Sequence, residues 1–280
     1  MPMRSLAWVT DSTSTLDPSF MEQNHIYMVP LRLILGNQEF REQVDISAEQ
    51  FYEKMLNEPK VGSSQPPIGE FIELYESLKE RYDDIIAVHC SAGLSGTLNT
   101  SIQAAEIAEA DVIAIDSKFG AFPVREMIQS GVQWHQDGCS AEEIAERIRK
   151  MREMTKFYLI PFSLQRLHAG GRMSGTKLVF SQLLKIHLLL RFDDGKVIVD
   201  EKIRTYKKAR QRMLDYLSND IASTSKICIM HAGNLEEALS VQRELSELYP
   251  EVPSEIMTFI PVAGIYAGEG TIALSWILKS

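Results

Sequence analysis

The chain has 280 residues, of which 45% are hydrophobic and 24% are charged, and its net charge is −9. This composition is typical of a globular protein, and a length above that of most single domains predicts two domains with a sizeable core. The negative charge argues against a nucleic-acid partner, because phosphate backbones require a concentrated basic surface.

The cysteines and the N-terminus favour a cytoplasmic protein. The three cysteines, Cys90, Cys139 and Cys228, lie far apart and form no CxxC pair, so we interpret them as reduced thiols. The N-terminus shows no charged region followed by an apolar segment and a cleavage site, and no apolar run reaches the length of a transmembrane helix. We therefore expect a soluble intracellular protein.

The first half of the chain alternates short apolar runs with helical patterns. Strands are predicted over 6–9, 26–35 (as one or two strands), 85–88 and 112–115, and helices over 48–56, 71–78, 98–109, 124–135 and 141–154. Such alternation is typical of a parallel sheet flanked by helices, which binds ligands at the carboxyl ends of its strands. No G-x-G-x-x-G follows a strand convincingly, so a dinucleotide site is not supported.

The second half shows a different order of elements. Strands are predicted over 157–160, 188–192, 197–199, 227–230 and 256–260, and helices over 206–217 and 235–249. The segment Asp193-Asp194-Gly195-Lys196 between two apolar runs is a strong hairpin signal, because Asp-Gly tolerates positive φ. We expect a two-domain α/β fold, in which residues 1–158 form the parallel domain and residues 159–280 form a domain with a mixed or antiparallel sheet.

The stretch from Ser91 to Thr97 is the first candidate binding segment. It follows the predicted strand 85–88 and precedes a helix, so free backbone N–H groups and the positive end of the helix dipole face outward together. Ser95 is interpreted either as a hydrogen-bond donor to an anion or as a helix cap or turn residue. A nucleophilic role has less support, because its second glycine stands one place too early for the G-x-S-x-G elbow. His89 and His231 are the candidate general bases for such a nucleophile, and the position of neither along the sequence supports that role.

Other polar segments stand at comparable positions. Ser63 and Ser64 precede two prolines and could donate to the same ligand, or serve only as turn residues. Asp11 and Asp116 both follow strands, where their carboxylates are expected to orient loops by accepting N–H bonds. No cluster of histidines or carboxylates accompanies them, so we predict no metal site.

The segment Gly170-Gly171-Arg172 combines backbone freedom with a planar guanidinium suited to phosphate or carboxylate. A simple turn with a solvated charge is the alternative. Arg204 is interpreted as a surface charge, with a functional role kept open. Cys90, beside the Ser91–Thr97 stretch, is interpreted as buried packing, with reactivity as the alternative.

Taken in order along nearly the whole chain, these segments resemble the DegV family of bacterial fatty-acid-binding proteins. The matching segments are T-D-S-T-S, S-S-Q-P, S-A-G-L-S-G-T, D-S after a strand, L-Q-R-L-H-A-G-G-R and the glycine-rich segment 264–270. The resemblance implies an interdomain tunnel for one acyl chain, such as palmitate, and no other cofactor. It also implies that the carboxylate is held by Ser63 and Ser95.

The resemblance assigns expected roles to further residues. Tyr266 stands where a histidine is common near the carboxylate, and Glu269 stands where a proline is usual. Supporting loops are expected at Thr10, Asp11, Ser12, Ser64, Gly96 and Thr97. Some family members present the carboxylate to a separate ATP-using kinase subunit that forms an acyl phosphate, and Arg172 and Arg204 are the candidates for phosphate or kinase contact.

We therefore expect a non-catalytic lipid-binding protein with a role in lipid transport or fatty acid metabolism, including the supply of acyl groups for phospholipid synthesis. The alternatives are a serine hydrolase or esterase that uses Ser95, and a scaffold or regulatory protein that carries lipid incidentally.

Overall fold

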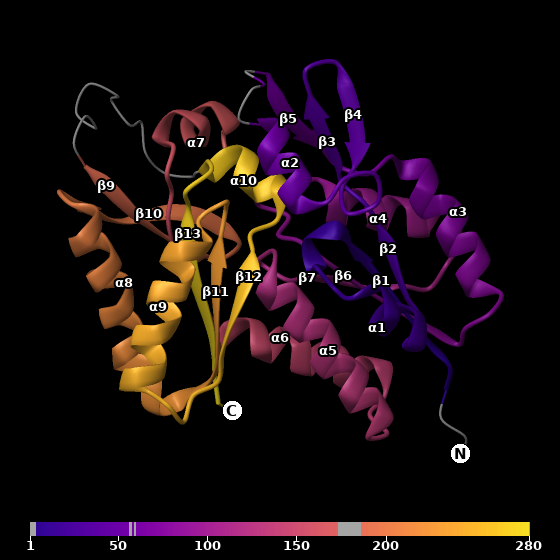
Figure 1. Ribbon diagram of the computed structural model, residues 1–280. Helices are drawn as coiled ribbons and strands as arrows, with labels where there is room; N and C mark the ends of the chain where they lie inside the picture. The colour runs from indigo at the N-terminus through magenta and orange to yellow at the C-terminus, as the bar shows by residue number, and fades with distance from the viewer. Residues whose placement is uncertain (1–3, 56–57, 59, 173–185, 280) are drawn as a thin grey trace. The chain divides into compact units, whose positions relative to one another are not determined.

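A computed structural model describes residues 4–55, 58, 60–172 and 186–279 and divides the chain into two compact units (Figure 1). The first unit comprises Met1–Ser47 and Gly62–Glu153, and the second comprises Ala48–Val61 and Met154–Ser280.

The first unit alternates strands with helices. Its elements are β1 (Leu6–Asp11), the 3-10 turn η1 (Ser12–Ser14), α1 (Pro18–Gln23), β2 (Ile26–Val29), β3 (Arg32–Leu35), β4 (Gln38–Arg41), β5 (Val61–Ser64), α3 (Ile68–Lys79), β6 (Asp84–His89), α4 (Thr97–Ile107), β7 (Ile113–Asp116), α5 (Phe122–Gln136) and α6 (Ala141–Glu153).

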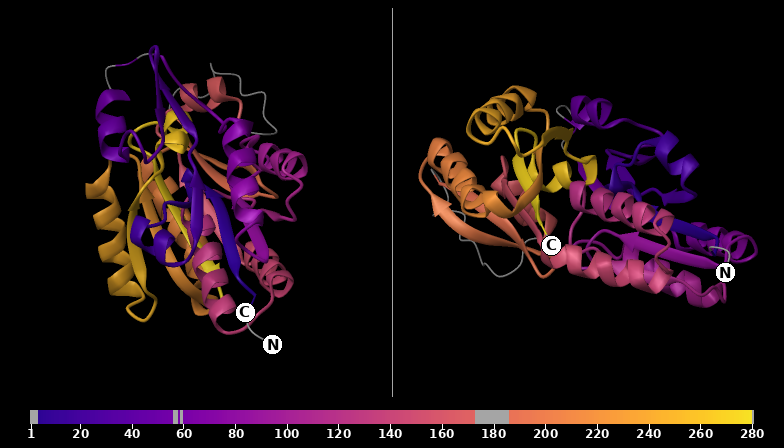
Figure 2. Two further views of the ribbon diagram at one scale, coloured as in Figure 1. Left: turned by 90° about the vertical axis from the view of Figure 1, so that its right-hand side faces the viewer. Right: turned by 90° about the horizontal axis from the view of Figure 1, so that it is seen from below.

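A parallel sheet in the order β2-β1-β6-β7 forms the centre of the first unit. Its central strands are apolar on both faces, as expected of a sheet covered by helices on both sides. Ala7, Val9, Ile85 and Ala87 point to one face and pack against residues of α3 and α4, including Phe71. On the opposite face, Trp8 packs against Gly131 of α5. The helix α6 contacts β6 and β7 (Figure 2).

The apolar run 26–35 forms two strands that belong to different sheets. β2 pairs with β1, whereas β3 pairs with β4 in a small sheet of order β4-β3-β5. Pro30 separates the two strands, and the buried Arg32 at the start of β3 donates to the Pro30 carbonyl and pairs with Glu70 of α3. β5 carries Ser63, so this small sheet positions one of the expected ligand residues.

The second unit is built on a mixed sheet of order β10-β9-β8-β13-β11-β12. Only β11 and β12 pair in parallel, and the other neighbours are antiparallel. Its elements are α2 (Ala48–Met55), β8 (Thr155–Ile160), α7 (Leu164–Gly170), β9 (His187–Asp193), β10 (Lys196–Ile203), α8 (Tyr206–Asp220), the 3-10 turn η3 (Ile221–Ser223), β11 (Thr224–His231), α9 (Leu235–Leu248), β12 (Ser254–Thr258), α10 (Pro261–Ala267) and β13 (Ile272–Leu278). The fold class expected from the sequence is thus confirmed.

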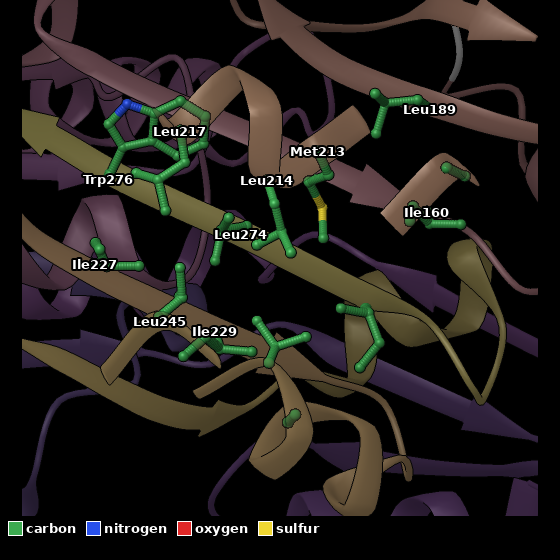
Figure 3. Close-up of a cluster of buried hydrophobic side chains, with 14 residues drawn as sticks. Ile160, Leu189, Met213, Leu214, Leu217, Ile227, Ile229, Leu245, Leu274 and Trp276 are labelled. Atoms are coloured by element: carbon green, nitrogen blue, oxygen red, sulfur yellow. The ribbon is translucent and has the colours of Figure 1, made fainter. Parts of the chain in front are cut away.

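Two features of the second unit follow directly from sequence chemistry. The predicted hairpin joins β9 to β10, and both of its central residues, Asp194 and Gly195, have positive φ angles of 44° and 77°. One face of the sheet packs against α8 and α9 through a cluster that includes Trp276 of β13 (Figure 3). The labelled side chains of this cluster are Ile160, Leu189, Met213, Leu214, Leu217, Ile227, Ile229, Leu245, Leu274 and Trp276.

The division into units differs from the boundary at residues 158 and 159 that was expected from the sequence. All of β8 pairs with β13, and Tyr158 and Leu159 also pair with β9, so residues 155–158 belong to the second sheet. The segment Ala48–Val61 also groups with the second unit. Its helix α2 is held there because the Tyr52 hydroxyl donates to the Phe259 carbonyl at 2.8 Å and its ring fills the space beside Gly264.

Gly131 on α5 provides a test of packing in the first unit. A Cβ at this position would collide with the indole ring of the fully buried Trp8. We expect Gly131→Ala to lower the free energy of unfolding by about 1–3 kcal/mol, because overpacking outweighs the gain of about 1 kcal/mol in helix propensity.

The matched control is Gly69→Ala on α3, where an added Cβ meets nothing within 4 Å. The free energy of unfolding of this variant should rise by a few tenths to about 1 kcal/mol. Urea titration of the wild type and both variants measures these changes. Equal effects of the two substitutions would contradict the packing argument.

Candidate functional site

The carboxyl ends of the parallel strands bring several polar residues to one edge of the first unit. β1 ends at Asp11, β6 at His89 and β7 at Asp116, and the register pairs Thr10 with Val88 and His89 with Asp116. These strand ends lie side by side because the strands are parallel. Edges of this kind are where open α/β sheets bind ligands.

Both aspartates orient the loops that follow the strands, as the sequence predicted. Asp11 accepts hydrogen bonds from the backbone N–H groups of Thr13 at 3.0 Å and Cys90 at 2.9 Å. Asp116 accepts from the N–H groups of Lys118 at 2.8 Å and Ala92 at 3.4 Å. The two carboxylates therefore fix the loop that connects β6 to α4.

Ser95 lies in this loop, half-buried, directly before α4. Its hydroxyl lies 2.8 Å from the hydroxyl of Thr97 and accepts the Thr97 N–H at 3.3 Å. The N-cap of α4 is Gly96, which has no side chain to cap the helix. Ser95 is therefore a turn residue that also presents a hydroxyl at the positive end of an 11-residue helix.

The segment that carries Ser63 reaches this loop through Gln65. The Gln65 amide donates to the Thr100 hydroxyl at 2.6 Å, and its oxygen lies so close to Gly96 that a Cβ there would collide with it. Ser63 is half-buried on β5, and Ser64 beside it is exposed. The structure thus brings together two segments that the sequence nominated separately, and Gln65 joins them.

The other expected supporting residues of the first unit bond inward. The Thr10 hydroxyl donates to the Val88 carbonyl at 2.9 Å, and the Ser12 hydroxyl donates to the buried Glu42 at 2.6 Å. The Ser12 hydroxyl also accepts the Leu31 N–H at 3.1 Å. Thr10 and Ser12 are fully buried, so they stabilise the edge from within.

A buried chain of side chains behind the loop was not found from the sequence. His89 lies 3.1 Å from Asp11 through Nδ1 and 2.9 Å from the Ser101 hydroxyl through Nε2, and Tyr75 lies 2.6 Å from the same hydroxyl. Burial raises the pKa of Asp11, but hydrogen bonds from His89, Thr13 and Cys90 outweigh it and hold that pKa below its ordinary value. Both ring nitrogens of His89 are engaged, so it is not arranged as a base for Ser95.

Cys90 is also enclosed at this edge. Burial raises the pKa of its thiol well above the ordinary value, and the nearby Asp11 carboxylate raises it further, against a smaller opposite effect of the Thr97 and Ser95 hydroxyls. A thiol is reactive as its thiolate, so this cysteine is poorly nucleophilic. Its interpretation as buried packing agrees with this geometry.

In the second unit, the arginine of the G-G-R segment lies against Tyr266. The guanidinium of the exposed Arg172 stacks over the Tyr266 ring at 4.7 Å from its centroid and donates to the Gly170 carbonyl at 2.7 Å. A Cβ at Gly170 would collide with the same ring. Arg204 is exposed between β10 and α8.

A hollow of about 590 Å³ opens in the second unit after β8 and β11. It is lined by Met55, Phe162, Ser163, Arg166, Gly233, Asn234, Gly268, Glu269 and Gly270. The side chain of Glu269 packs over Gly233, whose φ is +66°, and its carboxyl group occupies the space that a Cβ at Gly233 would need. Glu269 therefore forms part of the wall of this hollow.

The described residues contain neither a cluster of metal-ligating side chains nor a helix that could span a membrane. No group of three or more His, Cys, Asp or Glu side chains is arranged to hold a metal ion within residues 4–55, 58, 60–172 and 186–279. Over the same ranges, each helix is too short or too polar to cross a bilayer.

Comparison with known proteins identifies relatives that match nearly the entire chain. The family model described as "Uncharacterised protein, DegV family" matches residues 5–279. A DegV domain-containing protein of Halalkalibacterium halodurans is 33% identical over 282 residues, covering 99% of this chain and 100% of that protein.

Solved structures show the same similarity in three dimensions. The crystal structure of DegV, a fatty acid binding protein from Bacillus subtilis, is 33% identical and has a TM-score of 0.90, covering 99% of this chain and 100% of the other. A fatty acid binding DegV family protein from Streptococcus agalactiae is 24% identical and has a TM-score of 0.91, covering 99% of this chain and 100% of the other. The latter similarity bears on the fold alone.

The environment of Cys90 makes a prediction about thiol reactivity. Cys90 and Cys228 are buried, whereas Cys139 is partly exposed. We expect iodoacetamide at pH 8 to alkylate Cys139 in the native protein, and to alkylate Cys90 only after unfolding in urea. Peptide mass spectrometry would locate the modified residue. Labelling of native Cys90 at the rate of Cys139 would contradict the burial and raised pKa described above.

Proposed function

We propose that this chain, which belongs to the DegV family, binds one long-chain fatty acid and has no catalytic activity of its own. The observation that carries the proposal is its similarity, over both units, to the Bacillus subtilis protein described as fatty acid binding. In this proposal the protein serves lipid transport or fatty acid metabolism. The site at the edge of the first unit supports it, because neutral hydroxyl groups and a helix N-terminus can bind a carboxylate.

We assign the head-group contacts to Ser63, Ser95 and Tyr266. Ser95 is supported by its half-buried hydroxyl beside Thr97, and Ser63 by the docking of its segment through Gln65. Tyr266 is supported by its match to the family's glycine-rich segment and by its hydroxyl, which can donate a hydrogen bond. A buried carboxylate requires such donors, because an unpaired buried charge is costly.

The acyl chain would supply most of the binding free energy. Burial contributes about 0.8 kcal/mol per CH₂, or about 12 kcal/mol for a saturated chain of about sixteen carbons. Immobilisation of the ligand offsets much of this gain. The head-group hydrogen bonds then select a carboxylate over an uncharged lipid of the same length.

The hydrolase alternative has less geometric support. His89 is fully buried, and its two ring nitrogens are engaged with Asp11 and Ser101. A serine hydrolase requires a base within hydrogen-bond reach of its nucleophile. A hydrolase that uses Ser95 would turn over p-nitrophenyl palmitate and react with a fluorophosphonate probe, and both reactions would be abolished in Ser95→Ala.

Titration with palmitate tests the head-group assignment. We expect Ser95→Ala to weaken palmitate binding about 10- to 100-fold, because it removes one charge-assisted hydrogen bond of about 1.5–3 kcal/mol. Ser140→Ala, which removes a helix-capping hydroxyl elsewhere in the first unit, is the matched control and should leave the affinity unchanged. Isothermal titration calorimetry on delipidated protein measures both.

Hexadecanol, which has no carboxylate, distinguishes the head group from the chain. It should bind the wild type more weakly than palmitate and should be insensitive to Ser95→Ala. Wild-type palmitate affinity in the Ser95→Ala variant would exclude the assigned contact. Absence of fatty acid in purified protein, together with no binding of added palmitate or oleate, would exclude the function.

We further propose that the bound carboxylate is presented to a separate fatty-acid kinase subunit, with Arg172 and Arg204 at the contact. Both guanidinium groups are exposed and fit a phosphate or an acidic protein surface. Arg172→Ala should reduce acyl phosphate formation by a purified fatty-acid kinase subunit with ATP at least tenfold, measured by hydroxylamine trapping. Palmitate binding should change by less than about twofold, because one exposed cation contributes little.

The matched control for this experiment is Arg212→Ala. Arg212 stacks on Tyr216 at 4.8 Å much as Arg172 stacks on Tyr266, but it lies outside the matching segments. It should leave acyl phosphate formation unchanged. Equal losses in the two variants would show that the effect is a general one of surface charge.

A further inference from the structure

A series of four buried, hydrogen-bonded side chains behind the Ser95 loop connects four separate elements of the first unit. Tyr75 lies on α3, Ser101 on α4, His89 at the end of β6 and Asp11 at the end of β1. Successive polar atoms lie 2.6, 2.9 and 3.1 Å apart, and all four residues have 0% relative exposure. Water does not compete for these hydrogen bonds, so their geometry is enforced by packing.

The direction of the hydrogen bonds follows from the protonation of Asp11. Its pKa is held below the ordinary value despite the opposing effect of burial, chiefly by the hydrogen bond from His89, so the carboxylate is ionised and accepts from Nδ1–H. In a neutral imidazole Nε2 then accepts from the Ser101 hydroxyl, which in turn accepts from Tyr75. Burial raises the pKa of Tyr75, which keeps its phenol neutral and available as a donor.

The four hydrogen-bonded side chains lie next to the loop that carries Ser95. The loop of residues 90–96 begins immediately after His89 and ends where α4 begins, one helical turn before Ser101. The bond from His89 to Ser101 therefore ties the two ends of the loop together. Asp11 adds a second tie, because the oxygen that accepts from His89 also accepts the Cys90 N–H at 2.9 Å.

We propose that Asp11, His89 and Ser101 are positioning residues, which hold the loop so that the Ser95 hydroxyl points to the carboxylate of the ligand. This inference rests on the proposed function and assigns to it residues that do not touch the ligand. Ser101 is the most informative of the three, because among these four hydrogen-bonded side chains it is the one that lies on α4.

The four hydrogen-bonded side chains offer a matched pair of substitutions. Ser101→Ala removes the link between α4 and His89 and leaves Nε2 without its donor. Tyr75→Phe removes a buried hydrogen bond of the same chain but keeps the link between Ser101 and His89. Each variant loses buried hydrogen bonding, so both should lower the melting temperature. Only Ser101→Ala should disturb the loop.

Palmitate affinity and hydrogen exchange together test the proposal. We expect Ser101→Ala to weaken palmitate binding about tenfold and to accelerate amide exchange in the peptide that contains Leu94 and Ser95, whose N–H groups bond to the Ser91 carbonyl. Tyr75→Phe should change each quantity by less than about twofold. In a Ser95→Ala background, Ser101→Ala should weaken binding no further, because it acts through Ser95.

Three results would overturn the proposal: equal effects of Ser101→Ala and Tyr75→Phe on binding and exchange, an unchanged Ser91–Thr97 exchange rate in Ser101→Ala, or a full additional loss of affinity in the double variant. Ser101→Cys, which keeps the side-chain volume and weakens the hydrogen bond, replaces Ser101→Ala if the latter does not fold. If the wild type binds no palmitate, the proposed function fails, while the exchange comparison on ligand-free protein still decides whether these residues position the loop.

Discussion

The edge of the first unit at the carboxyl ends of its strands depends on the hydrogen bonds of one buried carboxylate. Asp11 is completely buried, and a buried charge of this kind costs several kcal/mol unless it is fully hydrogen-bonded. It meets that condition by accepting from the backbone and hydroxyl of Thr13, from His89 and from the Cys90 N–H. The ends of β1 and β6 are therefore bound to one another beyond their strand pairing, and the loops on both sides inherit a fixed geometry.

In the proposed function this edge binds an anion although it contains carboxylates. Asp11 and Asp116 are engaged with backbone N–H groups of the loops at this edge. Ser95 adds a neutral, half-buried hydroxyl just before α4. Neutral donors favour an ionised head group through hydrogen bonds alone, without the desolvation cost of a buried cation. The edge thus combines carboxylates that are engaged with backbone N–H groups and the neutral hydroxyl of Ser95.

Much of the fold could be predicted from local pattern, because most strands are short apolar runs and most helices show clear periodicity. β13 was missed, since its continuous apolar run after a glycine-rich segment does not distinguish strand from helix. Of the site, the Ser63 and Ser95 segments were found, but their connection through Gln65 depends on tertiary packing against Gly96. His89 carried no spacing signal, because its partners lie 78 and 12 residues away in the chain.

The tyrosine at position 266, where the resemblance to the family leads us to expect a histidine, has a physical consequence for Arg172. A neutral aromatic ring attracts a guanidinium placed over its face, whereas a protonated histidine at the same position would repel it. The observed stack, with Gly170 leaving room for the ring, therefore depends on tyrosine. Arg172 contacts both the ring and the Gly170 carbonyl. The tyrosine thus orients a cation through its ring face, which a titrating histidine could do only in its neutral form.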